Sequence, residues 1–231
     1  MKAHEEKRSQ NDRDDFRQPY VITLLRHGES VANAEDIWQG QLDFALTDKG
    51  RTQAKAVAER WRSGGVSFDL IISSPLRRAQ ETAEIIGNVL NVKVEADPLW
   101  MERDVGQIAG LTSVQFREKF PETAMSNPFD PMGVDGEGDW ILFLRAGQAL
   151  NNLLNRPSGQ YLVVSHGGIL NQVMHAVVGI TPHAKSAGLR FQFKNSSFSR
   201  LIYFPSQHRW TIDSMNDHCH SPESREEDPR N

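Results

Sequence analysis

A guanidinium, an imidazole and a glycine stand side by side at Arg26-His27-Gly28, directly after the apolar run 21–25. Arginine offers a planar fork of N–H donors that fits phosphate. Histidine serves as a nucleophile or proton carrier near neutral pH, and glycine lets backbone N–H groups approach an anion. The apolar run predicts a buried parallel strand, and open α/β sheets bind ligands beyond the carboxyl ends of such strands. The tripeptide alone arises by chance in on the order of a few per cent of chains this long.

Two further apolar runs end in polar residues of the same kinds. The strand predicted at 68–73 is followed by Arg78, and the strand predicted at 161–165 is followed by His166-Gly167-Gly168. The two glycines open a helix, whose free N–H groups and dipole favour an anion. Because open α/β sheets place ligands at the carboxyl ends of their strands, all three motifs are expected to surround one anionic ligand.

A metal site is the alternative to an anion site. His27 and His166 could share a metal ion, but the flanking arginines would repel a cation. The tract His218-Cys219-His220 is interpreted as polar residues of a charged tail. The sequence therefore predicts no metal site.

Strands and helices alternate along the chain. Apolar periodicity and capping residues predict helices at 47–61, 75–90, 140–154 and 168–178. A short strand is expected at 92–95, and a final hairpin at 198–204 and 209–212. Prolines and glycines make 105–138 irregular apart from a short helix at 113–119. This order predicts an α/β fold, a three-layer α/β/α sandwich with a mostly parallel central sheet.

Composition limits the compartment and the partners. The chain has 231 residues, a formal net charge of −4 and 38% hydrophobic residues. Polar tails are expected at 1–19 and 216–231, flanking a single domain at 20–215. The sequence has no basic block for nucleic acid, no apolar stretch for a bilayer and no secretory signal. The single Cys219 forms no internal disulfide. We therefore expect a cytoplasmic protein without nucleic-acid or membrane partners. The oligomeric state stays open.

The chain resembles the histidine phosphatase superfamily, which includes the cofactor-dependent phosphoglycerate mutases. The resemblance covers roughly 20–215 and rests on several segments in order. These are Arg26-His27-Gly28-Glu29-Ser30 with Asn33; Gln39-Gly40, Asp43 and Leu46-Thr47 with Gly50; Ser74-Pro75-Leu76-Arg77-Arg78-Ala79 with Thr82; Leu99 to Glu102 with Gly106 and Gly110; Ser165-His166-Gly167-Gly168; and Asn195-Ser196-Ser197.

The resemblance implies a role for each matching residue. His27 would be the nucleophile that forms a phosphohistidine, and Glu102 would protonate the leaving group. Arg26, Arg78 and His166 would bind the phosphoryl oxygens. Alignment on Ala79 favours Arg78 over Arg77. The rest of the phosphate pocket would comprise Asn33, Gln39, Gly40 and Gly167. No cofactor and no metal is expected, because the cationic donors supply positive charge to the transition state.

The region after the third segment helps to distinguish a phosphatase from a mutase. Mutases of the superfamily carry extra basic residues there, and a Tyr-Gly pair. Here 117–122 is mixed in charge, Asp104-Val105-Gly106 replaces the pair, and four acidic residues follow at Asp130, Asp135, Glu137 and Asp139. A solvated loop without bearing on substrate is the alternative interpretation. Residues 105–138 and 181–188 are expected to frame the pocket mouth.

The favoured function is a metal-independent phosphomonoesterase of the histidine acid phosphatase type. Its substrate would be a small phosphorylated molecule, either a metabolite or a phosphopeptide. One alternative is phosphoglycerate mutase-type phosphoryl transfer. A second is a catalytically inactive protein that binds phosphorylated ligands, and a third is a bisphosphatase domain detached from a kinase partner, which the short tails disfavour.

Overall fold

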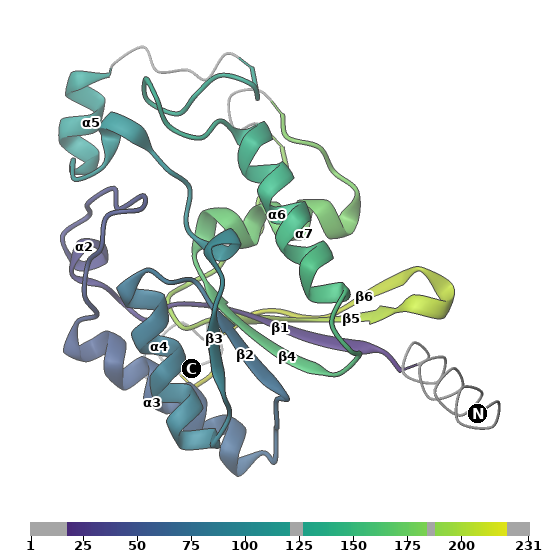
Figure 1. Cartoon of the computed structure of the whole chain (residues 1–231). Helices are drawn as coiled ribbons and strands as arrows, with labels where there is room; N and C mark the ends of the chain where they lie inside the picture. Colours follow the sequence, from purple (N-terminus) through teal and green to yellow (C-terminus); the bar gives the residue numbers. More distant parts are fainter. Residues whose placement is uncertain (1–17, 121–126, 184–187, 221–231) are drawn as a thin grey trace, which may run out of the picture.

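One six-stranded sheet organises the chain. The computed structural model describes residues 18–120, 127–183 and 188–220. The sheet order is β3-β2-β4-β1-β5-β6 (Figure 1). The first four strands are parallel to one another, and β5 is antiparallel to both of its neighbours, β1 and β6. The strands are β1 (Tyr20–Arg26), β2 (Leu70–Ser73), β3 (Val94–Ala96), β4 (Gln160–Ser165), β5 (Phe198–Phe204) and β6 (Arg209–Asp217). The predicted mostly parallel α/β sheet is confirmed.

Helices cover both faces of this sheet (Figure 1). The α-helices are α2 (Val31–Ala34), α3 (Asp48–Ser63), α4 (Arg77–Leu90), α5 (Ser113–Lys119), α6 (Asp139–Leu154) and α7 (Gly167–Val178). Single turns of 3-10 helix are η1 (Pro98–Trp100), η2 (Gly106–Ile108) and η4 (Pro205–Gln207). The sequence predicted neither α2 nor these turns, because one turn is too short to show an apolar period. Among the described residues, no helix is long and apolar enough to cross a membrane.

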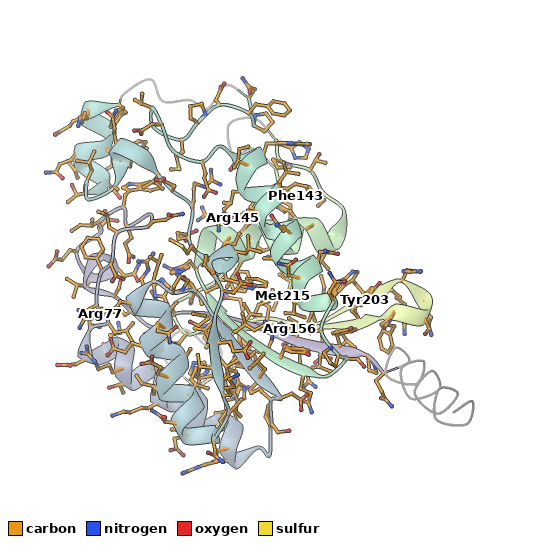
Figure 2. All side chains as sticks on the ribbon, in the orientation of Figure 1. Arg77, Phe143, Arg145, Arg156, Tyr203 and Met215 are labelled. Atoms are coloured by element: carbon orange, nitrogen blue, oxygen red, sulfur yellow. The ribbon has the colours of Figure 1, made fainter. Side chains whose placement is uncertain are left out.

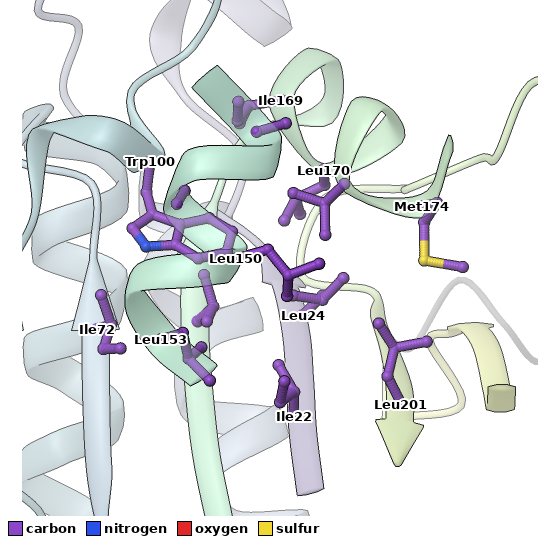
Figure 3. Close-up of a cluster of buried hydrophobic side chains, with 14 of the residues drawn as sticks. Ile22, Leu24, Ile72, Trp100, Leu150, Leu153, Ile169, Leu170, Met174 and Leu201 are labelled. Carbon is purple, nitrogen blue, oxygen red and sulfur yellow. The ribbon is translucent and has the colours of Figure 1, made fainter. Parts of the chain in front are cut away.

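The core has two parts because successive side chains of a strand point to opposite faces. In β1, Ile22 and Leu24 pack with α6, α7 and the fully buried Trp100 (Figure 3). Leu25 points the other way and packs with α3 and α4. Both faces of the parallel strands are therefore apolar, and polar side chains gather at the strand ends.

The C-terminal boundary predicted at residue 216 is wrong, since β6 continues to Asp217. Arg60 of α3 holds Asp217 with two hydrogen bonds, at 2.6 and 2.7 Å. The ring of His220 stacks on Phe198, with 6.2 Å between centroids. The tract 218–220 is thus packed against the domain. The sequence did not predict this, because the tail is rich in charged residues and its partners, Arg60 and Phe198, are distant in the chain. Most of the predicted tails, 1–17 and 221–231, lies outside the described residues.

Candidate active site

The paired ends of β1 and β4 bring two histidines together. Arg26 is opposite Ser165 in the parallel register, and the backbone N–H of His27 donates to the Ser165 carbonyl over 2.9 Å. His27 and His166 each follow one of these paired residues, and their ring centroids are 5.1 Å apart. The two strand-end motifs therefore meet at one point, as their positions in the sequence predicted.

His27 is held as one neutral tautomer. Its Nδ1 lies 2.6 Å from the carbonyl oxygen of Gly28. A carbonyl can only accept, so Nδ1 carries the proton and Nε2 has a free lone pair. Burial lowers the pKa of His27 well below its usual value, and the charges of Arg78 and Arg26 lower it further. The ring is therefore neutral at neutral pH, with the lone pair on Nε2.

His166 is oriented from both sides. The Nε–H of Arg78 donates to its Nδ1 over 3.2 Å, so its proton is on Nε2, which lies 2.8 Å from the hydroxyl of Ser74. Burial lowers the pKa of His166 far below its usual value, followed by the charge of Arg78. The ring is neutral and presents an N–H group at the end of β4.

Arg78 is a buried cation fixed by backbone carbonyls. Its Nη1 donates to Leu42 O and its Nη2 to Gly40 O, each over 2.8 Å, and the residue is 1% exposed. Burial lowers the pKa of Arg78 to about 10, which leaves the side chain charged at neutral pH. Gly40 thus orients Arg78 with its carbonyl; its φ of +50° and the 2.6 Å from a built Cβ to Val105 require glycine there.

Of the two adjacent arginines, only Arg78 lies in the site. Arg77 is exposed at the start of α4, at the edge of the molecule (Figure 2). Its backbone N–H donates to Asp43 over 2.6 Å. Neighbouring positions of a helix point in different directions, which is why the sequence favoured one of the pair.

Arg26 has a buried donor without a protein partner among the described residues. Its Nη1 donates to the carbonyl of Phe193 over 2.8 Å, while its Nε makes no hydrogen bond there. Burial lowers the pKa of Arg26, and the charge of Glu102 opposes this. Gly167 is next to this nitrogen, since a Cβ added at Gly167 would lie 3.8 Å from the Nε of Arg26. An orphaned guanidinium N–H in a cavity favours an anionic ligand.

The helix N-terminus predicted to hold the ligand instead holds Glu102. Its Oε2 accepts from the N–H of Gly168 over 3.0 Å, and its Oε1 accepts from Ile169 over 3.1 Å. The N–H of Arg103 also donates to Oε1, over 2.8 Å. The first turn of α7 therefore binds a carboxylate of the protein itself with the N–H groups of Gly168 and Ile169, and both Glu102 and Gly167 line the same cavity as His27.

Asn195 is a site residue that the sequence did not single out. Its Nδ2 donates to the His27 carbonyl over 3.1 Å and to Asn33 Oδ1 over 3.0 Å. Asn33 thus supports Asn195, whereas Asn195 and Gln39 line the cavity themselves. Gln39 Oε1 accepts from the Ser30 hydroxyl over 2.8 Å. The Asn195-Ser196-Ser197 segment was the available signal, but it carried no role.

The cavity over this cluster is about 1190 Å³, far larger than a phosphate group. Val105, Met132 and Pro182 line it, so parts of both expected mouth segments do frame it, while 121–126 and 184–187 lie outside the described residues. Besides Arg26 and Arg78, it is lined by the cations Lys49, Arg103, Arg190 and Lys194. The sequence pattern assigned them no role, although Arg103 and Lys194 directly adjoin the motif residues Glu102 and Asn195.

The donor set of this cavity fits an anion. In the part of the chain that the structure describes, no three His, Cys, Asp or Glu side chains form a metal-binding group. The His27 and His166 rings are flanked by two guanidinium groups; one nitrogen of His27 and both nitrogens of His166 are engaged by groups of the protein. Fixed guanidinium cations suit an anion and disfavour a metal ion.

This fold and this cluster of two histidines and two arginines define an anion site of an α/β protein, and the family comparison agrees. Residues 22–218 match the model of the histidine phosphatase superfamily, branch 1. The chain belongs to the histidine phosphatase superfamily.

Curated relatives and solved structures carry different activities in their names. A "probable phosphoglycerate mutase GpmB" from Yersinia enterocolitica is 36% identical over 206 residues, 86% of this chain and 94% of that protein. A mycobacterial glucosyl-3-phosphoglycerate phosphatase, solved with VO3, is 29% identical with a TM-score of 0.72, covering 85% of this chain and 99% of that one. A phosphoserine phosphatase from Entamoeba histolytica is 25% identical with a TM-score of 0.69, covering 87% and 98%. The names support an enzyme acting on a small phosphorylated substrate.

Proposed function

We propose that this protein hydrolyses phosphate monoesters through a phosphohistidine at His27, without a metal. The observation that carries the proposal is the neutral His27 ring, whose Nδ1 is bound to Gly28 O and whose Nε2 makes no hydrogen bond within 18–120, 127–183 and 188–220. Around it lie Arg26, Arg78 and His166, which would bind the phosphoryl oxygens. These residues are the predicted set.

In the first step, the His27 Nε2 lone pair attacks phosphorus and the bond from phosphorus to the ester oxygen breaks. Glu102 in its acid form would give its proton to that oxygen, so the leaving group departs as an alcohol. The arginines would stabilise charge on the phosphoryl oxygens. The product of this step is phosphohistidine with an ionised Glu102.

In the second step, water attacks phosphorus and the bond from phosphorus to nitrogen breaks. Glu102 would take a proton from the water, which restores its acid form, and inorganic phosphate leaves. One carboxyl group can act as acid and then as base because its two protonation states alternate through the cycle. Neutral His27 is thereby regenerated.

Mutase-type transfer is the second candidate, and two observations keep it in the comparison. The curated relatives carry the mutase name, and Arg103, Arg190 and Lys194 line the cavity, which provides basic side chains near the site. Two of the four acidic residues after the third segment, Glu137 and Asp139, are paired with arginines, as described below. We favour hydrolysis because solved neighbours of 29% and 25% identity are named phosphatases, and because Asp104-Val105-Gly106 replaces the Tyr-Gly pair of the mutases.

The test is turnover of p-nitrophenyl phosphate by the purified chain. We expect activity without added metal, no loss with a chelator, and none in His27→Ala. A parallel assay of 3-phosphoglycerate isomerisation, and a screen of phosphorylated metabolites and phosphopeptides, decides between hydrolysis and transfer. Loss of activity with chelator, or full activity of His27→Ala, would contradict the mechanism. Binding without turnover of any substrate would support the inactive alternative.

A cytoplasmic location remains part of the proposal. It rests on the single cysteine.

A further inference from the structure

Arg145 of α6 binds the backbone that carries Glu102. Its Nη1 donates to Leu99 O over 3.0 Å and to Met101 O over 2.6 Å, and its Nη2 donates to Glu102 O over 3.1 Å. One guanidinium group thus donates hydrogen bonds to three carbonyl oxygens within four consecutive residues. Arg145 lies near the middle of α6, away from its ends (Figure 2).

Arg145 occupies a position on the buried stripe of its helix. Leu142, Ala146, Ala149 and Leu153 are buried at helical spacing, and position 145 is three residues after Leu142. A charged group on such a stripe needs buried partners, since desolvation is costly. Its side chain is 15% exposed, so the carbonyls of the 99–102 segment, together with a carboxylate, supply those partners.

Glu137 supplies the counter-charge. Its Oε1 and Oε2 accept from Arg145 Nε and Nη2 over 2.9 and 2.6 Å, and its Oε2 also accepts from Asp104 N over 2.9 Å. The neighbouring Asp139 forms an ion pair with Arg103. These two carboxylates of the acidic stretch are therefore not solvated: they bind Arg103 and Asp104, the two residues that follow Glu102.

A second contact, from a different part of the chain, holds the same backbone. Gln41 Nε2 donates to Glu102 O over 3.0 Å, and the carbonyls of its neighbours Gly40 and Leu42 bind Arg78. The Glu102 carbonyl therefore has two side-chain donors, and its carboxylate has three backbone donors. A backbone with this many contacts has little freedom to move the carboxylate relative to a bound phosphoryl group.

We propose that Arg145, paired with Glu137, is the positioning residue that aims the Glu102 carboxyl at the leaving-group oxygen. The inference rests on the proposed function, because it assigns Glu102 the proton transfer. Arg145 itself touches no reacting atom. Its removal should impair proton transfer to the leaving group while phosphoryl binding by the arginines and His166 persists.

The test compares two leaving groups. p-Nitrophenolate departs without a proton, whereas an alkoxide such as that of glycerol phosphate needs one. The main variant is Arg145→Met combined with Glu137→Leu, which leaves neither charge unpaired. We expect kcat/KM for the alkyl phosphate to fall at least about tenfold more than kcat/KM for p-nitrophenyl phosphate. In a Glu102→Gln background the same pair of changes should lower kcat/KM for the alkyl phosphate by less than about a further twofold.

Two controls keep the result interpretable. Arg156→Met removes another arginine ion pair, which Arg156 forms with Glu95 over 2.9 Å near the end of α6 (Figure 2). Among the described residues, no hydrogen bond joins its side chain to residues 99–102. This variant should change kcat/KM little, and by the same factor for both substrates. Glu137→Gln keeps the shape of the pair, and should shift the substrate ratio in the same direction by less.

Each outcome decides the inference. Equal losses on both substrates, or a loss that persists in full in the Glu102→Gln background, would show that Arg145 acts only through stability and would overturn the proposal. If the double variant does not fold, the substrate ratio of Glu137→Gln decides instead, and an unchanged ratio overturns it. Failure of the wild type to hydrolyse either ester is a different result, because it contradicts the proposed function itself.

Discussion

Arg78 donates from Nε to Nδ1 of His166 over 3.2 Å, and this bond joins the first turn of α4 to the end of β4. It fixes the tautomer of the histidine. Together with the carbonyl oxygens of Gly40 and Leu42, His166 Nδ1 is one of three acceptors that hold the guanidinium group. The two residues are 88 positions apart. A cation and a neutral ring therefore enter the site as one rigid unit.

This unit gives a first prediction from two adjacent arginines. Arg78→Met should lower kcat for p-nitrophenyl phosphate by about 10²-fold or more, because it removes a fixed donor for transition-state charge. Arg77→Met, whose side chain is exposed, is the matched control and should stay within about twofold of wild type. Steady-state kinetics of both variants checks this; comparable losses would place Arg77 in the site instead.

A second prediction concerns Glu102→Gln. The amide keeps the size of the side chain but can neither give nor take the proton. Hydrolysis of an alkyl phosphate should fall by about 10²- to 10⁴-fold. The phosphorylation of His27 by p-nitrophenyl phosphate should fall much less, since p-nitrophenolate leaves unprotonated, and burst kinetics separates this step from hydrolysis of phosphohistidine. Equal losses in the phosphorylation step for both esters would count against Glu102 as the acid.

A third prediction is a dependence of stability on pH. The pKa of His27 and of His166 is lowered in the folded protein by burial and by Arg78, whereas in the unfolded chain a histidine titrates near about 6.5. Below that pH the unfolded state binds more protons than the folded one. The free energy of unfolding therefore decreases as pH falls through about 6.5, by up to about 1.4 kcal/mol per pH unit for each ring.

Urea unfolding at pH 7, 6 and 5 measures this effect. His166→Asn and His27→Asn should each make the decrease between pH 6.5 and 5 shallower than in wild type. A decrease as steep as that of wild type in both variants would mean that neither ring stays neutral in the folded protein.

A fourth prediction tests the close packing behind the nucleophile. A Cβ built on Gly28 would lie 2.5 Å from Gly50 O and 3.0 Å from its carbonyl carbon, both in backbone that cannot rotate away. Gly28→Ala should therefore destabilise the protein by about 1–3 kcal/mol. It should also lower activity, because Gly28 O holds His27 Nδ1.

Gly147 of α6 provides the control for that change. A Cβ there meets nothing within 4 Å among the described residues, and alanine is the better helix former by about 0.5–1 kcal/mol. Gly147→Ala should raise the denaturant midpoint while Gly28→Ala lowers it. Chemical denaturation of both variants distinguishes them, and an unchanged midpoint in Gly28→Ala would refute the packing argument.

Most of the fold could be predicted from local pattern. The buried strands are short apolar runs, the helices show apolar periodicity, and Thr47 caps α3 as its position suggested. One exception has a cause outside the local pattern. The hairpin strand β6 runs beyond 212 because Asn216 and Asp217 gain partners in Ser199 and Arg60, and a polar strand end of this kind has no apolar signal.

The sequence by itself determined which residues gather at the strand ends. Arg26, His27 and His166 each follow an apolar run, and parallel strands present their carboxyl ends along one edge of the sheet. Topology therefore places such residues together without any knowledge of side-chain contacts. The choice of Arg78 over Arg77 followed from matching Ala79 to the family pattern.

Only the tertiary structure decided what occupies the helix N-terminus and what the acidic stretch does. Glu102 reaches Gly168 across 66 residues, and Arg145 reaches Leu99 across 46. A carboxylate in a sequence looks the same whether it is solvated or buried against a guanidinium. Its partner is fixed by packing between elements distant in the chain, and this is the information that a local pattern does not contain.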